Sequence, residues 1–173
     1  MIFLTLNSIK MPVFEIKQIV ETDLATCWDF FSDPRNLAMI TPPDMNFVIK
    51  YPHTIPRMYR GMIIRYTVSP MFKIPLEWVT EITQVENESY FVDNQIKGPF
   101  KLWHHQHIFK QTETGVEMTD IVNYELPFGL IGELTAKSLV EKRIENIFRF
   151  RRTVIDNRFK AQIQDTHLLN SLK

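Results

Sequence analysis

A run of short strand-like segments followed by one long helical stretch constrains this sequence more than any other feature. Between residues 45 and 126, polar and apolar residues alternate in segments separated by short breaks rich in Pro, Gly, Asn and Glu. After Pro127-Phe128-Gly129 the apolar residues recur at helical steps instead. Because the breaks are short, neighbouring strands should pair as hairpins in an antiparallel sheet. One long amphipathic helix at about 130–160 then remains to cover that sheet.

The predicted elements have a distinctive order. A strand at 13–20 precedes two short helices, one over Leu24 to Phe31 and one over 34–40 that begins at Ser32-Asp33-Pro34. Six further strands are predicted near 45–51, 61–69, 76–85, 89–97, 101–110 and 116–126. This order predicts an α+β fold in which a curved antiparallel sheet wraps around the C-terminal helix. A strongly curved sheet does not close flush on a rod, so we expect a hollow between the two.

The chain of 173 residues fits one domain. We expect an N-terminal extension at 1–11, the folded domain at 12–160 and a C-terminal tail at 161–173, with Met11 as a possible natural start.

The composition narrows the class of partner and the compartment. A formal net charge of zero argues against nucleic acid. The sequence has no apolar stretch of the ~20 residues that a membrane span requires. The single cysteine, Cys27, lies on an apolar helix face and fits a reducing, cytoplasmic compartment. The scattered glycines form no phosphate-binding loop, and we expect no cofactor.

Strand parity assigns side chains to the two faces of the sheet, because successive strand residues point to opposite sides. One parity carries nearly all the large aromatic residues, so we assign it to the interior. This set comprises Trp78, Thr80, Ile82, Phe91, Asp93, Gln95, Trp103, His105, His107, Phe109, Met118, Asp120, Val122 and Tyr124.

The first hairpin turn predicts which of these residues face one another. If that turn centres on Pro99, Asp93 lies opposite His105 and Gln95 lies opposite Trp103. Directly opposed side chains have Cβ atoms about 4.5–5.5 Å apart.

The second hairpin adds a second acid–imidazole pair. If its turn centres near Glu113, His107 lies opposite Asp120 and Trp103 lies opposite Tyr124. The interior should therefore hold two Asp–His pairs within an aromatic surround, and buried polar groups of this kind need partners.

Four interpretations of these pairs remain open. They can satisfy one another as a structural network, or form the polar end of a ligand cavity. They can also supply the acid and base of a catalytic reaction. His105 and His107, with Asp93 or Asp120, could in principle hold a metal ion, although we favour no metal.

The C-terminal helix also carries a set of basic residues. We interpret it as a solvated face, because Glu145 precedes Arg149 by four residues. The set comprises Arg143, Arg149, Arg151, Arg152, Arg158 and Lys160.

Several segments resemble a known superfamily. They are CWDFFSDPRNLAMITPP, PLEWVTEI, FVDNQIKGPFKLWHHQHIF, MTDIVNYELPFG and IFRFRR. Over about Pro12 to Phe159 the chain resembles the bacterial SRPBCC branch of the START/Bet v 1-like superfamily, of the ligand-binding or polyketide cyclase/dehydrase-like type. The resemblance implies a helix-grip fold and a cavity for lipid, polyketide, sterol or quinone-like ligands. No catalytic set follows from it.

These observations predict a protein that binds a small hydrophobic molecule with a polar group, with transport or sequestration as the roles that such binding could serve. The expected ligand-binding residues are Tyr66, Trp78, Phe91, Asp93, Gln95, Trp103, His105, His107, Asp120 and Tyr124. One alternative is a cyclase or dehydratase in which His105, His107, Asp93 and Asp120 act as acid and base. Another is a protein-interaction module whose cavity is filled by side chains. We lean away from an enzyme, since a fold does not fix a function.

Overall fold

A computed structural model describes residues 11–51, 57–127 and 133–171, including the side chains of 137–161 in the last helix. The predicted extension at 1–11 therefore lies outside the described residues except for Met11. The predicted breaks at 52–56 and 128–129, and the predicted helix start at 130, also lie outside them.

The described elements follow the predicted order. They are β1 (Val13–Val20), α1 (Leu24–Phe31), the 3₁₀ helices η1 (Pro34–Ala38) and η2 (Pro43–Met45), β2 (Val48–Tyr51), β3 (Ile63–Val68), β4 (Leu76–Glu86), β5 (Tyr90–Lys97), β6 (Leu102–Thr112), β7 (Gly115–Glu125) and α2 (Glu133–Ser171).

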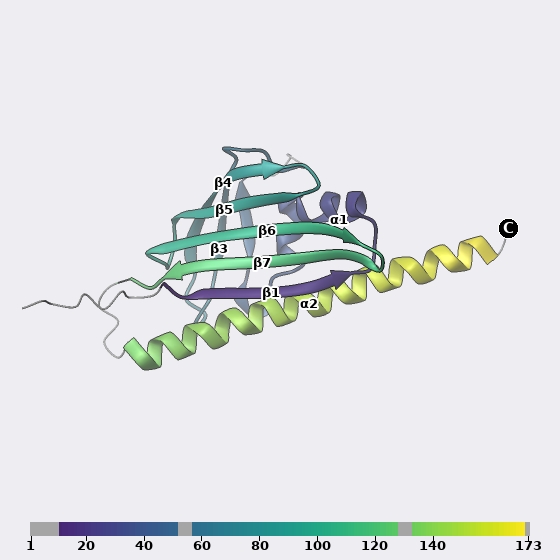
Figure 1. Ribbon diagram of the computed structural model, residues 1–173. Helices are drawn as coiled ribbons and strands as arrows, with labels where there is room; N and C mark the ends of the chain where they lie inside the picture. The colour runs from purple at the N-terminus through teal and green to yellow at the C-terminus, as the bar shows by residue number, and fades with distance from the viewer. Residues whose placement is uncertain (1–10, 52–56, 128–132, 172–173) are drawn as a thin grey trace, which may run out of the picture.

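The seven strands in this part of the chain form one curved antiparallel sheet in the order β1-β7-β6-β5-β4-β3-β2. Figure 1 shows α2 running along the sheet beside β1. Helix α1 lies against β6 and β7 at the ends that are joined by the β6–β7 hairpin. The α+β architecture predicted from the sequence is confirmed. None of the helices in the described ranges is both long and apolar enough to cross a membrane.

Helix α1 begins where its sequence provides a cap. The Asp23 carboxylate accepts a hydrogen bond from the Thr26 backbone N–H at 2.8 Å, which satisfies one of the free donors of the first turn. The helix buries Cys27, Trp28 and Phe31 against the sheet. Burial raises the pKa of the Cys27 thiol to about 12, so this residue is a core side chain rather than a nucleophile.

Several element boundaries differ from the prediction, most of them by one or two residues. The second short helix is a 3₁₀ helix over Pro34–Ala38, a form common in such short pieces. The strand predicted at 45–51 is shorter, because η2 ends at Asn46 in a left-handed conformation (φ 46°) and β2 begins only at Val48.

Helix α2 continues to Ser171, beyond the predicted end near 160. No Pro or Gly occurs between Glu133 and Ser171, so this stretch contains no residue that strongly opposes a helix.

Candidate functional site

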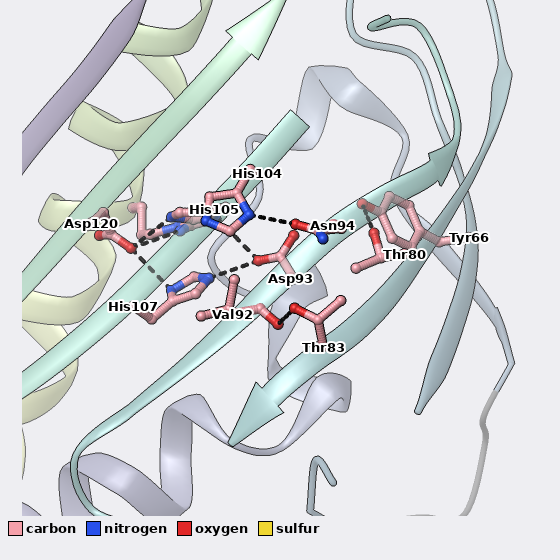
Figure 2. A network of polar contacts seen from close by, with 11 residues as sticks. Tyr66, Thr80, Thr83, Val92, Asp93, Asn94, His104, His105, His107 and Asp120 are labelled. Carbon is pink, nitrogen blue, oxygen red and sulfur yellow. Dashed lines mark hydrogen bonds and ion pairs between the residues drawn. The ribbon is translucent and has the colours of Figure 1, made fainter. Parts of the chain in front are cut away.

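A cluster of acidic and imidazole side chains lies on the inner face of three neighbouring strands (Figure 2). Asp93 comes from β5, His105 and His107 from β6, and Asp120 from β7. The register pairs Asp93 with His105 and His107 with Asp120, as the hairpin positions predict. The neighbouring His104 points away and lies 2.7 Å from Asn94 Oδ1, through its Nδ1 atom.

The aromatic part of the predicted register is confirmed in one hairpin. Trp103 lies opposite Tyr124, as expected. The ladder between β5 and β6 ends at Asn94 and His104, one step before the predicted pairing of Gln95 with Trp103. Gln95 instead donates a hydrogen bond from Nε2 to the Phe100 carbonyl at 2.7 Å and so closes the β5–β6 turn.

The two predicted pairs are joined into a single network. His105 Nε2 lies 3.0 Å from Asp120 Oδ1, and its Nδ1 lies 3.4 Å from Asp93 Oδ2. His107 Nε2 lies 2.9 Å from Asp93 Oδ2, and its Nδ1 lies 3.0 Å from Asp120 Oδ1, although this last approach lacks hydrogen-bond geometry. Each imidazole therefore lies between both carboxylates, and the ring centroids are 3.7 Å apart.

The network fixes the charge of its members. Burial by itself raises the pKa of Asp93 and Asp120, but hydrogen bonds from His105 and His107 outweigh it and hold both pKa values far below the usual range. Burial lowers the pKa of His105, yet its hydrogen bonds to Asp120 and Asp93 raise that pKa overall. Two carboxylates thus remain ionised inside the protein, with His105 favoured as the imidazolium.

Arg151 of α2 completes the charged site and corrects the prediction of a wholly solvated basic face. Its side chain is buried, with Nη1 3.9 Å from Asp120 Oδ1 and Cζ 4.7 Å from the Phe148 ring centroid. The apolar helix positions contain a seven-residue gap between Phe148 and Ile155, and Arg151 occupies the missing turn on that face. This gap in the apolar pattern indicates that residue 151 faces the sheet. The sequence analysis did not use it, because arginine side chains are usually exposed.

Arg143 also departs from a simple solvated position. It donates a hydrogen bond from Nε to the Pro70 carbonyl at 2.7 Å and forms an ion pair with Asp44 at 2.9 Å. Arg149, Arg158 and Lys160 are exposed, whereas Arg152 is partly buried and donates a hydrogen bond to the Lys17 carbonyl of β1.

A cavity of about 330 Å³ lies between the sheet and α2, bordered by this network. Seven of the predicted ligand-binding residues line it: Tyr66, Trp78, Phe91, Asp93, Trp103, His105 and His107. Three do not. Asp120 lies behind the imidazoles, Tyr124 packs with Val122 and Phe148, and Gln95 lies at the turn.

The sequence predicted that the inner face of the C-terminal helix borders the hollow, but it named no lining residues there or in the loops, because strand parity applies to strands alone. The α2 contribution includes Val140, Arg143, Ile144, Ile147, Phe148 and Arg151. The early segments add Phe31, Leu37, Ile40, Met45, Phe47 and Met58.

The cluster also contains the donor set for a cation. The ligand atoms of Asp93, His105 and His107 lie within 4.8 Å of one another. However, each imidazole nitrogen lies within 3.4 Å of a carboxylate oxygen, and the Arg151 cation stands beside Asp120. This charge pattern favours the hydrogen-bonded network over a metal centre.

Solved structures with the same architecture span most of this chain. TTHA0849 from Thermus thermophilus shares 15% identity over 87% of this chain and 99% of its own, with a TM-score of 0.66. The di-domain ARO/CYC StfQ from the steffimycin biosynthetic pathway shares 10% identity over 88% of this chain and 51% of its own, with a TM-score of 0.68. Ara h 8.0201 shares 9% identity over 84% and 97%, with a TM-score of 0.56.

These likenesses define the class of fold. The chain has the START/Bet v 1-like helix-grip fold, as the sequence resemblance implied. No protein-family profile matches the sequence, and no curated protein matches it either. At these identities the comparisons describe the fold, and function has to be argued from the site.

Proposed function

We propose that this protein binds a small hydrophobic molecule carrying a polar group, in the cavity between the sheet and α2, and that it does so in the cytoplasm. The observation that carries the proposal is the cavity of about 330 Å³, lined mainly by aromatic and aliphatic side chains with the Asp–His network in one wall. This combination is typical of sites for small organic ligands, which are largely apolar with a few placed polar groups.

The apolar wall suits a flat or aromatic ligand body. Trp78 packs edge-on to Trp103 at 5.4 Å between ring centroids and stacks on Tyr66 at 5.9 Å. Phe100 packs between the two indoles, at 5.7 Å from Trp78 and 4.8 Å from Trp103. These rings contact one another yet leave the space beside them open, which argues against an interaction module with a filled cavity.

Binding is favoured over acid–base catalysis by the state of the imidazoles. All four ring nitrogens of His105 and His107 lie within 3.4 Å of carboxylate oxygens. His107 Nδ1 makes no hydrogen bond, but it is buried beside Asp120, and the hydrogen bonds of His107 to Asp93 and of His105 to Asp120 would have to break before those nitrogens could exchange a proton with a substrate. StfQ is an ARO/CYC protein, and this likeness makes aromatic polyketides reasonable members of a ligand panel without assigning their chemistry to this chain.

The proposal is tested by filling the cavity. Val140 and Leu139 are neighbours on α2, but only Val140 lines the cavity, while Leu139 is exposed. Native mass spectrometry and thermal shift with a panel of fatty acids, quinones and aromatic polyketides should detect a bound species in the unmodified protein. Val140→Trp should abolish that binding, and the matched Leu139→Trp should retain it. Failure of the whole panel to bind would reject the proposal.

A further inference from the structure

Two buried groups of the cavity wall that can only donate hydrogen bonds have no acceptor among the described residues. Trp78 Nε1 and Arg151 Nε are buried and make no hydrogen bond to the described residues. Their side chains are closed to solvent, with residue exposures of 7% and 9%, and both line the cavity. A buried polar group without a partner costs about 1–3 kcal/mol, and more when it is charged. Such groups therefore point to an acceptor that the protein itself does not supply.

The guanidinium of Arg151 is the stronger of the two. Within the described part of the chain it contacts Asp120 only at 3.9 Å, which is too long for a hydrogen bond, and lies over the Phe148 ring. The same oxygen of Asp120 already accepts a hydrogen bond from His105 at 3.0 Å. Arginine has five N–H donors and no acceptor, and an acceptor in the cavity can satisfy the Nε donor that the described residues leave unpaired.

The neighbouring acids do not compete for this role. Asp93 Oδ2 and Asp120 Oδ1 accept hydrogen bonds from His107 and His105, so the charge of each carboxylate already has a donor beside it within the protein. Trp78 adds another donor that cannot accept. The unpaired groups of the cavity wall that can only donate are therefore Trp78 Nε1 and Arg151 Nε, and Arg151 carries a positive charge.

We propose that the polar group of the ligand is an anionic oxygen group, a carboxylate, bound by the Arg151 guanidinium with the Trp78 indole N–H as a second donor. This inference rests on the proposed function and specifies the class of ligand. A planar guanidinium matches a carboxylate with two parallel hydrogen bonds, and the apolar surround strengthens them. The ligand is accordingly a hydrophobic carboxylic acid that enters as its anion.

The test uses two series of probes that differ only in the polar group. One series is 2-naphthoate, 2-naphthylmethanol and 2-naphthylmethylamine, and the other is decanoate, decanol and decylamine. Calorimetry should show that the unmodified protein binds at least one carboxylate about tenfold more tightly than the matching alcohol, as charge-assisted hydrogen bonds require. Two ligand shapes are used so that a poor fit of one body does not mask the preference.

Variants assign the preference to the two donors. Arg151→Gln should bring the carboxylate and the alcohol to within about twofold of each other while alcohol binding persists, because charge-assisted bonds carry the discrimination. Trp78→Phe keeps an aromatic ring but removes the N–H, and it should weaken carboxylate binding about threefold to tenfold. Arg149→Gln, on the exposed side of the same helix, is the matched control and should retain the full preference.

The possible outcomes separate the two proposals. If no probe of either series binds, the ligand-binding function itself is rejected. If acids, alcohols and amines bind equally well, the function stands and the carboxylate assignment is wrong. Tightest binding of the amines would also overturn it, and would show that Asp93 or Asp120 recognises the ligand instead. Loss of folding in Arg151→Gln leaves the comparison of probes on the unmodified protein as the deciding result.

Discussion

The two halves of α2 meet the sheet in different ways. Toward its C-terminal side, Ile155 and Phe159 are fully buried, and Phe159 packs edge-on to Phe30 of α1 at 5.6 Å between ring centroids. Toward its N-terminal side, Ile144 and Ile147 face the cavity. The same apolar face of α2 therefore packs into a closed core in one part of the helix and lines the cavity in the other.

This difference explains why the cavity lies beside the first half of α2 and not beside the second. Helix α1 inserts Trp28 and Phe31 between the sheet and the second half of α2, and these rings contact Phe109 of β6 at 5.5 Å. The first half of α2 has no such helix between it and the sheet in the described residues, as Figure 1 shows. Arg151 lies at the boundary, where the aromatic core ends and the charged network begins.

The largest expected effect comes from opening the sealed half. Phe159→Ala should lower the free energy of unfolding by about 3–5 kcal/mol, because it removes a buried ring and leaves a cavity in a packed core. Ligand affinity, measured by calorimetry in the folded variant, should change little. Urea unfolding gives the stability difference.

The matched change in the open half is Ile147→Ala. Its side chain already borders a void and is only partly buried, so the loss should be about 1 kcal/mol or less. Ligand affinity should fall instead. Equal destabilisation by the two substitutions would contradict the division of α2 into sealed and open halves.

A substitution in the Asp–His network, at the boundary between the two halves, should have the next largest effect on the free energy of unfolding. Asp120→Asn keeps the shape of the side chain but removes the charge that holds His105 and faces Arg151, so it should destabilise the protein by about 3 kcal/mol. Asp29→Asn is the control, because the Asp29–Arg57 ion pair is exposed and contributes about 1 kcal/mol at most. A cost no larger than that of the control would show that the network is dispensable for stability.

The pH dependence should be smaller and should have a defined sign. Folding lowers the pKa of Asp93 and Asp120 below the ordinary 3.8, so their stabilisation is present above that value and is lost as the pH falls. Folding raises the pKa of His105 above the ordinary 6.5, so its stabilisation is present below that value and is lost as the pH rises through the folded pKa. The network should stabilise most between about pH 4 and about pH 6.5.

Unfolding in urea at two pH values measures this effect. The stability difference between the unmodified protein and Asp120→Asn should shrink from about pH 6 to about pH 9, because the contribution of the His105 imidazolium is lost as the pH rises through its raised pKa. The exposed-pair variant Asp29→Asn should show no comparable change. A difference that grows toward pH 9 would contradict the assignment of His105 as the imidazolium.

Much of the site could be predicted from local sequence. Period-two alternation placed Asp93, His105, His107 and Asp120 on one face, and the short turns of the β5–β6 and β6–β7 hairpins fixed which of them lie opposite one another. The outward direction of His104 followed from the same parity. These features are set by neighbours close in sequence, and hairpin geometry transmits them with little freedom.

The sequence by itself thus determined the order of elements, the inner face of the sheet and the residues that meet there. Only the tertiary structure decided that both imidazoles lie between both carboxylates, because side-chain rotamers and diagonal neighbours depend on the curvature of the sheet. It also decided that Arg151 is buried and that half of α2 borders a cavity. These depend on how a helix far along the chain docks on the sheet, which no local pattern specifies.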